Sequence, residues 1–169
     1  MTFDEIIAQL QQAQGDPERL ALATVELTLA GHPPALKAAL EAAAVPHWFN
    51  AEILAHLLEV ELAEASRLEQ QLTALPMVEP FPARKGWNVH EATRLALRRR
   101  LHAEHAERFF ALSARAASLM ERSGQMVEYQ VEEIYHRLSS APPQGADLLK
   151  STYESWERGS LREATQALA

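Results

Sequence analysis

Apolar residues recur at helical spacing along most of this chain, and glycines and prolines divide the pattern into short helices. The punctuation predicts helices over 35–44, 51–58 and 61–75. Asn50 stands directly before the second of these helices and is a favoured residue type for its N-cap. The third helix carries one apolar stripe, which should face a core: Leu62, Ala65, Leu68, Leu72 and Leu75. The pattern predicts a mainly α protein.

The first 31 residues predict a helical hairpin ahead of the main unit. Its first helix should end at Gly15 and carries four apolar residues at helical spacing: Phe3, Ile6, Ile7 and Leu10. Asp16 followed by Pro17 predicts an N-cap and the start of a second helix, which runs to Ala30. This second segment also alternates apolar and polar residues, so a strand is an alternative. Its alanines and its length favour a helix.

Two short apolar segments around a turn follow the third helix of the main unit. They predict strands near 77–81 and 87–89, and the turn between them holds Pro82, two basic residues and Gly86. A further helix opens directly after the second strand, at His90. Helices closed by a two-stranded β-wing predict a winged helix-turn-helix over 32–102. The large aromatic residues near the wing are predicted to pack in its core: Trp48, Phe49 and Trp87.

The rest of the chain, 103–169, is predicted to form an arm of helical hairpins. Residues 91–138 contain no proline, and we expect a break in the helix near 102–104. Gly124 precedes a predicted helix at 127–138 and Gly159 separates two more, at about 145–157 and 161–169. The spacing of these two glycines is close to the roughly 34-residue period of tetratricopeptide repeats. The hairpins are therefore predicted to be of the tetratricopeptide-like type.

The last predicted helix carries an apolar strip of Leu161, Ala164 and Leu168. Repeat helices bury such strips only against a neighbour. We expect this strip to be a partner interface that a further repeat, a partner helix or a second copy of the chain covers, so self-association is one expectation.

Composition points to an intracellular protein without a membrane span. The chain has 169 residues, 47% of them hydrophobic, which is enough to bury a core. It has no cysteine, no long apolar run and no secretory leader, and we expect a cytoplasmic location. Its net charge of −7 disfavours general affinity for polyanions.

Known catalytic and cofactor motifs are absent from the sequence. There is no phosphate-binding loop and no Gly-x-Ser-x-Gly elbow, so no catalytic residue and no cofactor are predicted. His102 and His105 could share a helix face, but no third metal ligand is evident. We predict no metal site and a protein that is not an enzyme.

Three phrases of the sequence carry a resemblance to a known family: Val45 to Phe49, Asn88 to Arg94 and Ile134 to His136. From about 34 to 169 the chain resembles the winged helix and helical arm of bacterial signal-transducing ATPases of the STAND, NB-ARC-like type. Val89-His90-Glu91 stands where that family has a Met-His-Asp motif. The nucleotide-binding domain that normally precedes these parts is missing from the sequence.

The resemblance implies a role for His90 at the β-phosphate of bound ADP, where the family's histidine helps to hold the switch off. The nucleotide would then come from another chain or from another part of the protein. The implied protein partners are a nucleotide-binding domain, in cis or in trans, further helical repeats and an effector. The plainer interpretation is that His90 is a local cap or a partly buried hydrogen-bonding residue.

Two other functions remain open. A winged helix can be a DNA-binding transcription regulator, for which the basic residues near the wing are the candidate contacts: Arg84, Lys85, Arg98, Arg99 and Arg100. The helix that would enter the major groove is acidic, however, with Glu61, Glu64 and Glu69 against Arg67. Specific DNA binding is therefore disfavoured. The other alternative is a free-standing helical adaptor that recruits an effector.

Overall fold

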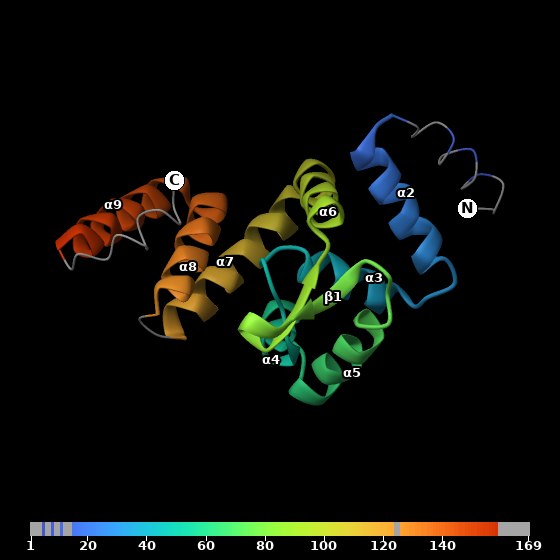
Figure 1. The fold of residues 1–169 in the computed structure, drawn as a ribbon, viewed down its shortest axis with the longest axis horizontal. Helices are drawn as coiled ribbons and strands as arrows, with labels where there is room; N and C mark the ends of the chain where they lie inside the picture. Colours follow the sequence, from blue (N-terminus) through green and yellow to red (C-terminus); the bar gives the residue numbers. More distant parts are fainter. Residues whose placement is uncertain (1–4, 6–7, 9–10, 12–14, 124–125, 159–169) are drawn as a thin grey trace. The chain divides into compact units, whose positions relative to one another are not determined.

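The computed structural model describes residues 5, 8, 11, 15–123 and 126–158 (Figure 1). This part of the chain is mainly α, with eight α-helices and one two-stranded antiparallel hairpin. The chain forms two compact units, residues 1–106 and 107–169. None of the helices in the described ranges is long and apolar enough to cross a membrane.

In the part of the first unit from residue 15 onward, four helices precede the hairpin and one follows it. In chain order these are α2 (Pro17–Leu29), α3 (Pro34–Ala43), α4 (Ala51–Leu58), α5 (Leu62–Leu72), β1 (Val78–Phe81), the 3₁₀ turn η1 (Pro82–Arg84), β2 (Gly86–Val89) and α6 (Glu91–Glu104). The helices predicted after Asp16 in this unit, and both strands, are confirmed within a few residues. The segment after Asp16 is a helix and not the alternative strand. The helix predicted over 61–75 ends earlier, at Leu72, although Leu75 is buried as predicted.

Two helix starts have the predicted chemistry. The Asp16 carboxylate accepts hydrogen bonds from the backbone N–H groups of Glu18 and Arg19, both at 3.1 Å, and Pro17 opens α2. The Asn50 side chain accepts one from the Ile53 N–H at 2.9 Å at the start of α4. These caps satisfy donors that have no partner within the helix, and each typically stabilises a helix by about 1 kcal/mol.

The core of the first unit lies where α3, α4 and α5 meet, and α6 adds a further apolar face to the unit. Residues predicted to pack on one stripe of α5 are buried, except for Leu62, which is exposed. Trp48 and Phe49 are buried as predicted, and Trp87 is half-buried. The largest fully buried side chains in this unit are Leu36, Leu40, Phe49, Leu54, Leu57, Leu72 and Leu97.

The hairpin is anchored by a third short stretch of extended chain. β1 pairs with β2 from Val78 opposite Val89 to Phe81 opposite Gly86. Phe49 and Trp87 also exchange two backbone hydrogen bonds, at 2.7 and 2.9 Å. A Cβ on Gly86 would lie 2.5 Å from the Phe49 carbonyl oxygen, so only glycine permits this approach. The sequence indicated two strands and missed this bridge.

Helix α2 packs against α6 within the first unit. Three of its residues are buried there: Ala23, Val25 and Leu29. The first helix of the hairpin predicted over 1–31 lies mostly outside the described residues. The break predicted near 102–104 occurs at His105, between α6 and α7 (Ala106–Arg122).

The second unit contains a tightly packed helical hairpin of α8 (Val127–Ser140) and α9 (Pro142–Arg158). A Cβ on Gly145 would lie 2.5 Å from the Leu138 backbone nitrogen, so the two helix backbones meet at this glycine. The Trp156 indole N–H donates to the Gln130 side chain at 2.8 Å. Helix α9 begins three residues before its predicted start because proline is tolerated in a first turn. Gly124, Gly159 and the predicted helix at 161–169 lie outside the described residues.

Candidate functional site

His90 lies at the junction between the hairpin and α6, as the sequence indicated. Its backbone N–H donates to the Met77 carbonyl at 2.9 Å, and its carbonyl accepts from the Arg94 N–H at 2.8 Å. The backbone is therefore part of the N-cap of α6, but the imidazole makes no capping hydrogen bond. Its Nε2 lies 3.4 Å from Oε2 of Glu79, and the two side chains are 49% and 50% exposed.

Glu79 links His90 to a third side chain across the hairpin. Asn88 stands opposite Glu79 in the register, and its Nδ2 donates to Oε1 of Glu79 at 3.0 Å. One carboxylate therefore contacts an amide and an imidazole on the surface of β1 and β2. We refer to Glu79, Asn88 and His90 as the hairpin-edge cluster. In this cluster the imidazole lies beside the Glu79 carboxylate and is open to solvent.

The two basic residues of the turn, Arg84 and Lys85, help to shape the turn and its contact with the core. The Arg84 guanidinium carbon lies 5.3 Å from the centre of the Trp48 ring, which is the geometry of a cation–π contact. Lys85 ends η1 with φ at 49°, and its N–H donates to the Pro82 carbonyl at 3.1 Å. The turn thus folds back onto the core aromatic residue that follows α3.

The arginine cluster of α6 is engaged within the first unit. Arg98 donates to the backbone carbonyl of Val45, and Arg99 forms an ion pair with Glu18 of α2. Arg100 donates to Oε1 of Glu26 at 2.7 Å. All three guanidinium groups, which were candidate phosphate contacts, have protein acceptors instead.

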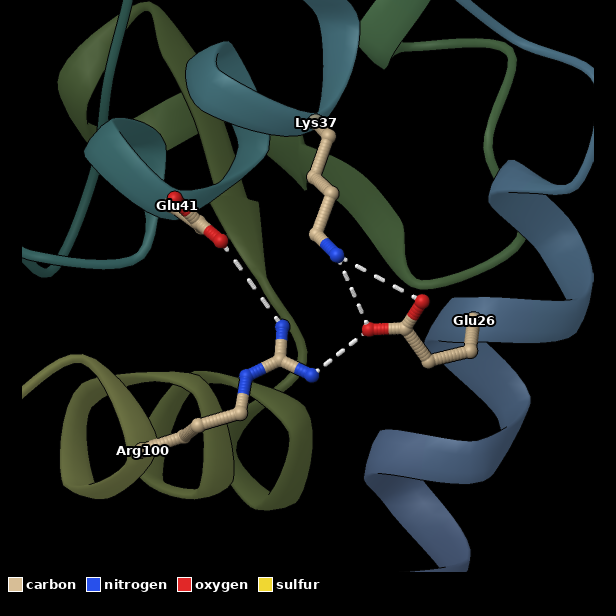
Figure 2. A network of polar contacts seen from close by, with 4 residues as sticks. All are labelled: Glu26, Lys37, Glu41 and Arg100. Atoms are coloured by element: carbon tan, nitrogen blue, oxygen red, sulfur yellow. Dashed lines mark hydrogen bonds and ion pairs between the residues drawn. The ribbon is translucent and has the colours of Figure 1, made fainter. Parts of the chain in front are cut away.

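Arg100 belongs to a four-residue network that joins α2, α3 and α6 (Figure 2). Glu26 of α2 receives Arg100 from one side and Lys37 of α3 from the other, with Lys37 Nζ 3.1 Å from its Oε1. Arg100 Nη2 also lies 3.8 Å from Oε1 of Glu41. The Glu26 and Arg100 side chains are 22% and 17% exposed. We refer to Glu26, Lys37, Glu41 and Arg100 as the α2 seam.

Electrostatics at the α2 seam favour the charged form of Glu26. Burial by itself raises the pKa of this carboxyl group, but the hydrogen bonds from Arg100 and Lys37 and their positive charges together outweigh it. The pKa of Glu26 is therefore lowered. Sequence reasoning missed this site. The available signal was a glutamate one residue after Val25 and three before Leu29, on the buried side of α2.

Helix α5 would be the recognition helix if the protein bound DNA, and its arginine, Arg67, is paired with a glutamate. Arg67 donates to Glu64 at 2.7 Å, and this hydrogen bond is the main cause of the lowered pKa of Glu64. Burial raises the pKa of Glu69, although the Ala51 backbone and the Trp87 side chain both hydrogen-bond to its carboxyl group. Glu69 thus links α5 by hydrogen bonds to the start of α4 and to β2.

The second unit buries one ionisable pair in α8. Nε2 of His136 lies 3.3 Å from Oε2 of Glu132, one turn earlier, and both side chains are at most 5% exposed. Leu161, Ala164 and Leu168, the predicted partner interface, lie outside the described residues. Across the described ranges, no group of three or more histidine, aspartate or glutamate side chains is arranged to hold a metal ion.

Comparisons with protein-family models, with curated proteins and with solved structures found no match to this chain. The structure is that of a mainly helical domain with a small antiparallel hairpin.

Proposed function

We propose that this chain is a non-enzymatic regulatory and scaffold segment of a STAND-type signalling protein. In this proposal the first unit is a winged helix that packs against a nucleotide-binding switch domain. The second unit is a tetratricopeptide-like arm that receives a partner or an effector. Protein–protein contact, and not chemistry on a substrate, is then the activity of the chain.

The order of the elements supports the winged-helix part of this proposal. Three helices, α3 to α5, precede an antiparallel hairpin, and the Phe49–Trp87 bridge attaches that hairpin to the helical core. A helical hairpin with closely packed backbones, α8 and α9, supports the arm.

The observation that carries the proposal is the placement of His90. The imidazole lies 3.4 Å from the Glu79 carboxylate, at the start of α6, and remains half exposed. A side chain that is oriented but not buried is available to a partner surface. In the family that the sequence resembles, the corresponding histidine meets the nucleotide from this junction.

A calorimetric titration of ADP into the chain tests the proposal. Tight phosphate binding needs a cradle of backbone N–H groups and a lysine, and one histidine does not replace them. We expect no dissociation constant in the micromolar range, because the nucleotide is to be held by another domain. A micromolar dissociation constant would contradict the proposal that another domain binds the nucleotide.

DNA binding is the weaker alternative. Its candidate contacts Arg98, Arg99 and Arg100 are bound to Val45, Glu18 and Glu26, and α5 keeps its acidic character. Phosphate contacts give a steep dependence of affinity on salt. A titration against duplex DNA at two salt concentrations should show weak binding at both; tight, salt-sensitive binding would favour the regulator of transcription instead.

A further inference from the structure

Helix α2 has the features of a removable element. It is well formed locally, since Asp16 caps it and Pro17 opens it. Its fully buried residues are few: one alanine, one valine and one leucine. Polar contacts make up much of its remaining attachment, through Glu18 to Arg99 and through Glu26 to Arg100 and Lys37. Surfaces of this mixed kind resemble those between partners that associate reversibly.

The surface that receives α2 carries a buried donor to which α2 gives no hydrogen-bond acceptor. Lys37 and Arg100 share the single carboxylate of Glu26. Arg100 Nη2 is buried, and at 3.8 Å from Glu41 it has no hydrogen bond to any of the described residues. A buried donor left in this way weakens the seam. A helix that brings another carboxylate to this position would therefore satisfy the surface better than α2 does.

We propose that the face of α3 and α6 under α2 is a docking site for an acidic amphipathic helix of a partner protein, and that α2 occupies this site in cis. The proposal deepens the proposed function, on which it rests, by naming the kind of partner. The argument for this occupant is charge complementarity, because two glutamates of α2 pair with cations of this face. Glu18 pairs with Arg99. Glu26 pairs with Arg100 and Lys37 (Figure 2).

The connection to α3 determines how firmly α2 competes. Only residues 30–33 join the two helices, and Gly31 takes a left-handed φ of 83°. A short link holds α2 near its site at an effective concentration that is typically in the millimolar range. A partner helix must therefore overcome this advantage, so the covalent link sets the threshold for docking.

The experiment removes this advantage without removing α2. A protease recognition site is inserted between Gly31 and His32, and the folded chain is cut. A labelled peptide of residues 15–30 is then titrated, with fluorescence anisotropy as the readout. We expect micromolar binding to the cut chain and at least about tenfold weaker binding to the uncut chain.

Three peptides and one protein variant test the charge recognition. The Glu26→Gln peptide should bind the cut chain about tenfold more weakly than the native peptide, while a Thr24→Ala peptide, changed at an exposed position, should bind equally. On a cut chain carrying Arg100→Gln, the difference between the native and Glu26→Gln peptides should become smaller, because only Lys37 remains to pair with Glu26. Equal affinities of these two peptides for the unchanged cut chain would overturn the proposal.

A second measurement keeps the test decisive if the cut chain does not stay folded. The native peptide should bind the uncut Glu26→Gln chain at least about fivefold more tightly than the uncut native chain, because the cis helix competes less well. No gain would overturn the proposal, as would a folded cut chain that never exchanges its α2. Dimers that form by exchange of α2 between uncut copies would overturn the proposal of a partner protein, because a second copy of the chain would then be the occupant. None of these readouts involves His90 or a nucleotide, so their failure leaves the ADP test unaffected.

Discussion

Two carboxylates of the first unit make similar polar contacts but differ in their exposure to solvent. Glu79 contacts Asn88 and His90 on the hairpin edge, and Glu26 contacts Lys37 and Arg100 in the α2 seam. The first pair of contacts is half exposed, while Glu26 and Arg100 are largely covered. Exposed ion pairs contribute about 0–1 kcal/mol, whereas breaking a buried pair commonly costs about 3–5 kcal/mol. Burial thus separates a cluster that is open to solvent from one whose ion pairs attach α2 to α3 and α6.

The largest effect should follow loss of the seam arginine. Arg100→Ala leaves Glu26 with Lys37 alone and removes a cation that lies 3.8 Å from Glu41. Because the site is partly open to solvent, we expect the free energy of unfolding to fall by about 2–3 kcal/mol, below the fully buried case. Urea unfolding followed by circular dichroism measures it.

The adjacent arginine is the matched control for this substitution. Arg99 also pairs with a glutamate of α2, but its side chain is 68% exposed. Arg99→Ala should cost under about 1 kcal/mol. Equal losses in the two variants would show that burial does not distinguish these pairs.

The next largest loss of stability should come from a change at the contact that attaches the hairpin to the helical core. In Gly86→Ala the new methyl group meets the Phe49 carbonyl oxygen at 2.5 Å, so backbone must move. We expect a loss of about 1–3 kcal/mol in unfolding free energy. Ala83→Ser, at an exposed position of the same turn, should be within about 0.5 kcal/mol of the native protein. A neutral Gly86→Ala would mean that the bridge to Phe49 does not fix the hairpin.

A smaller, pH-dependent effect should come from Glu26. Because its pKa is lowered in the folded state, its charge stabilises the fold above the ordinary carboxyl pKa, and this contribution is lost as pH falls through the lowered value. Glu26→Gln should therefore be less stable than the native protein near pH 7. The difference should shrink below about pH 4.5. A difference that stays constant from pH 7 to pH 3 would contradict the assigned cause.

The helices and hairpin could be predicted because their signals are local. Asp16, Asn50 and the turn around Gly86 specify their structures through neighbouring residues. The Phe49–Trp87 bridge could not, since a single extended residue between helices has no alternating pattern.

The α2 seam was hidden for a different reason. Arg100 and Glu26 are 74 residues apart, and charged helix positions usually face solvent. The sequence therefore presented Arg98, Arg99 and Arg100 as a basic cluster, and only tertiary structure shows that each has an acceptor. His90 was placed correctly because it follows the hairpin directly, but its contact with Glu79 depends on strand register.

The central claim is that His90 on the hairpin edge contributes little to folding, and His90→Ala tests it most directly. Urea unfolding of this variant should show a loss under about 1 kcal/mol, as for surface changes away from packed or paired groups. The loss should also be clearly smaller than that of Arg100→Ala measured beside it. A loss above about 3 kcal/mol would contradict the account, because His90 would then be a structural residue and not one held ready for a partner.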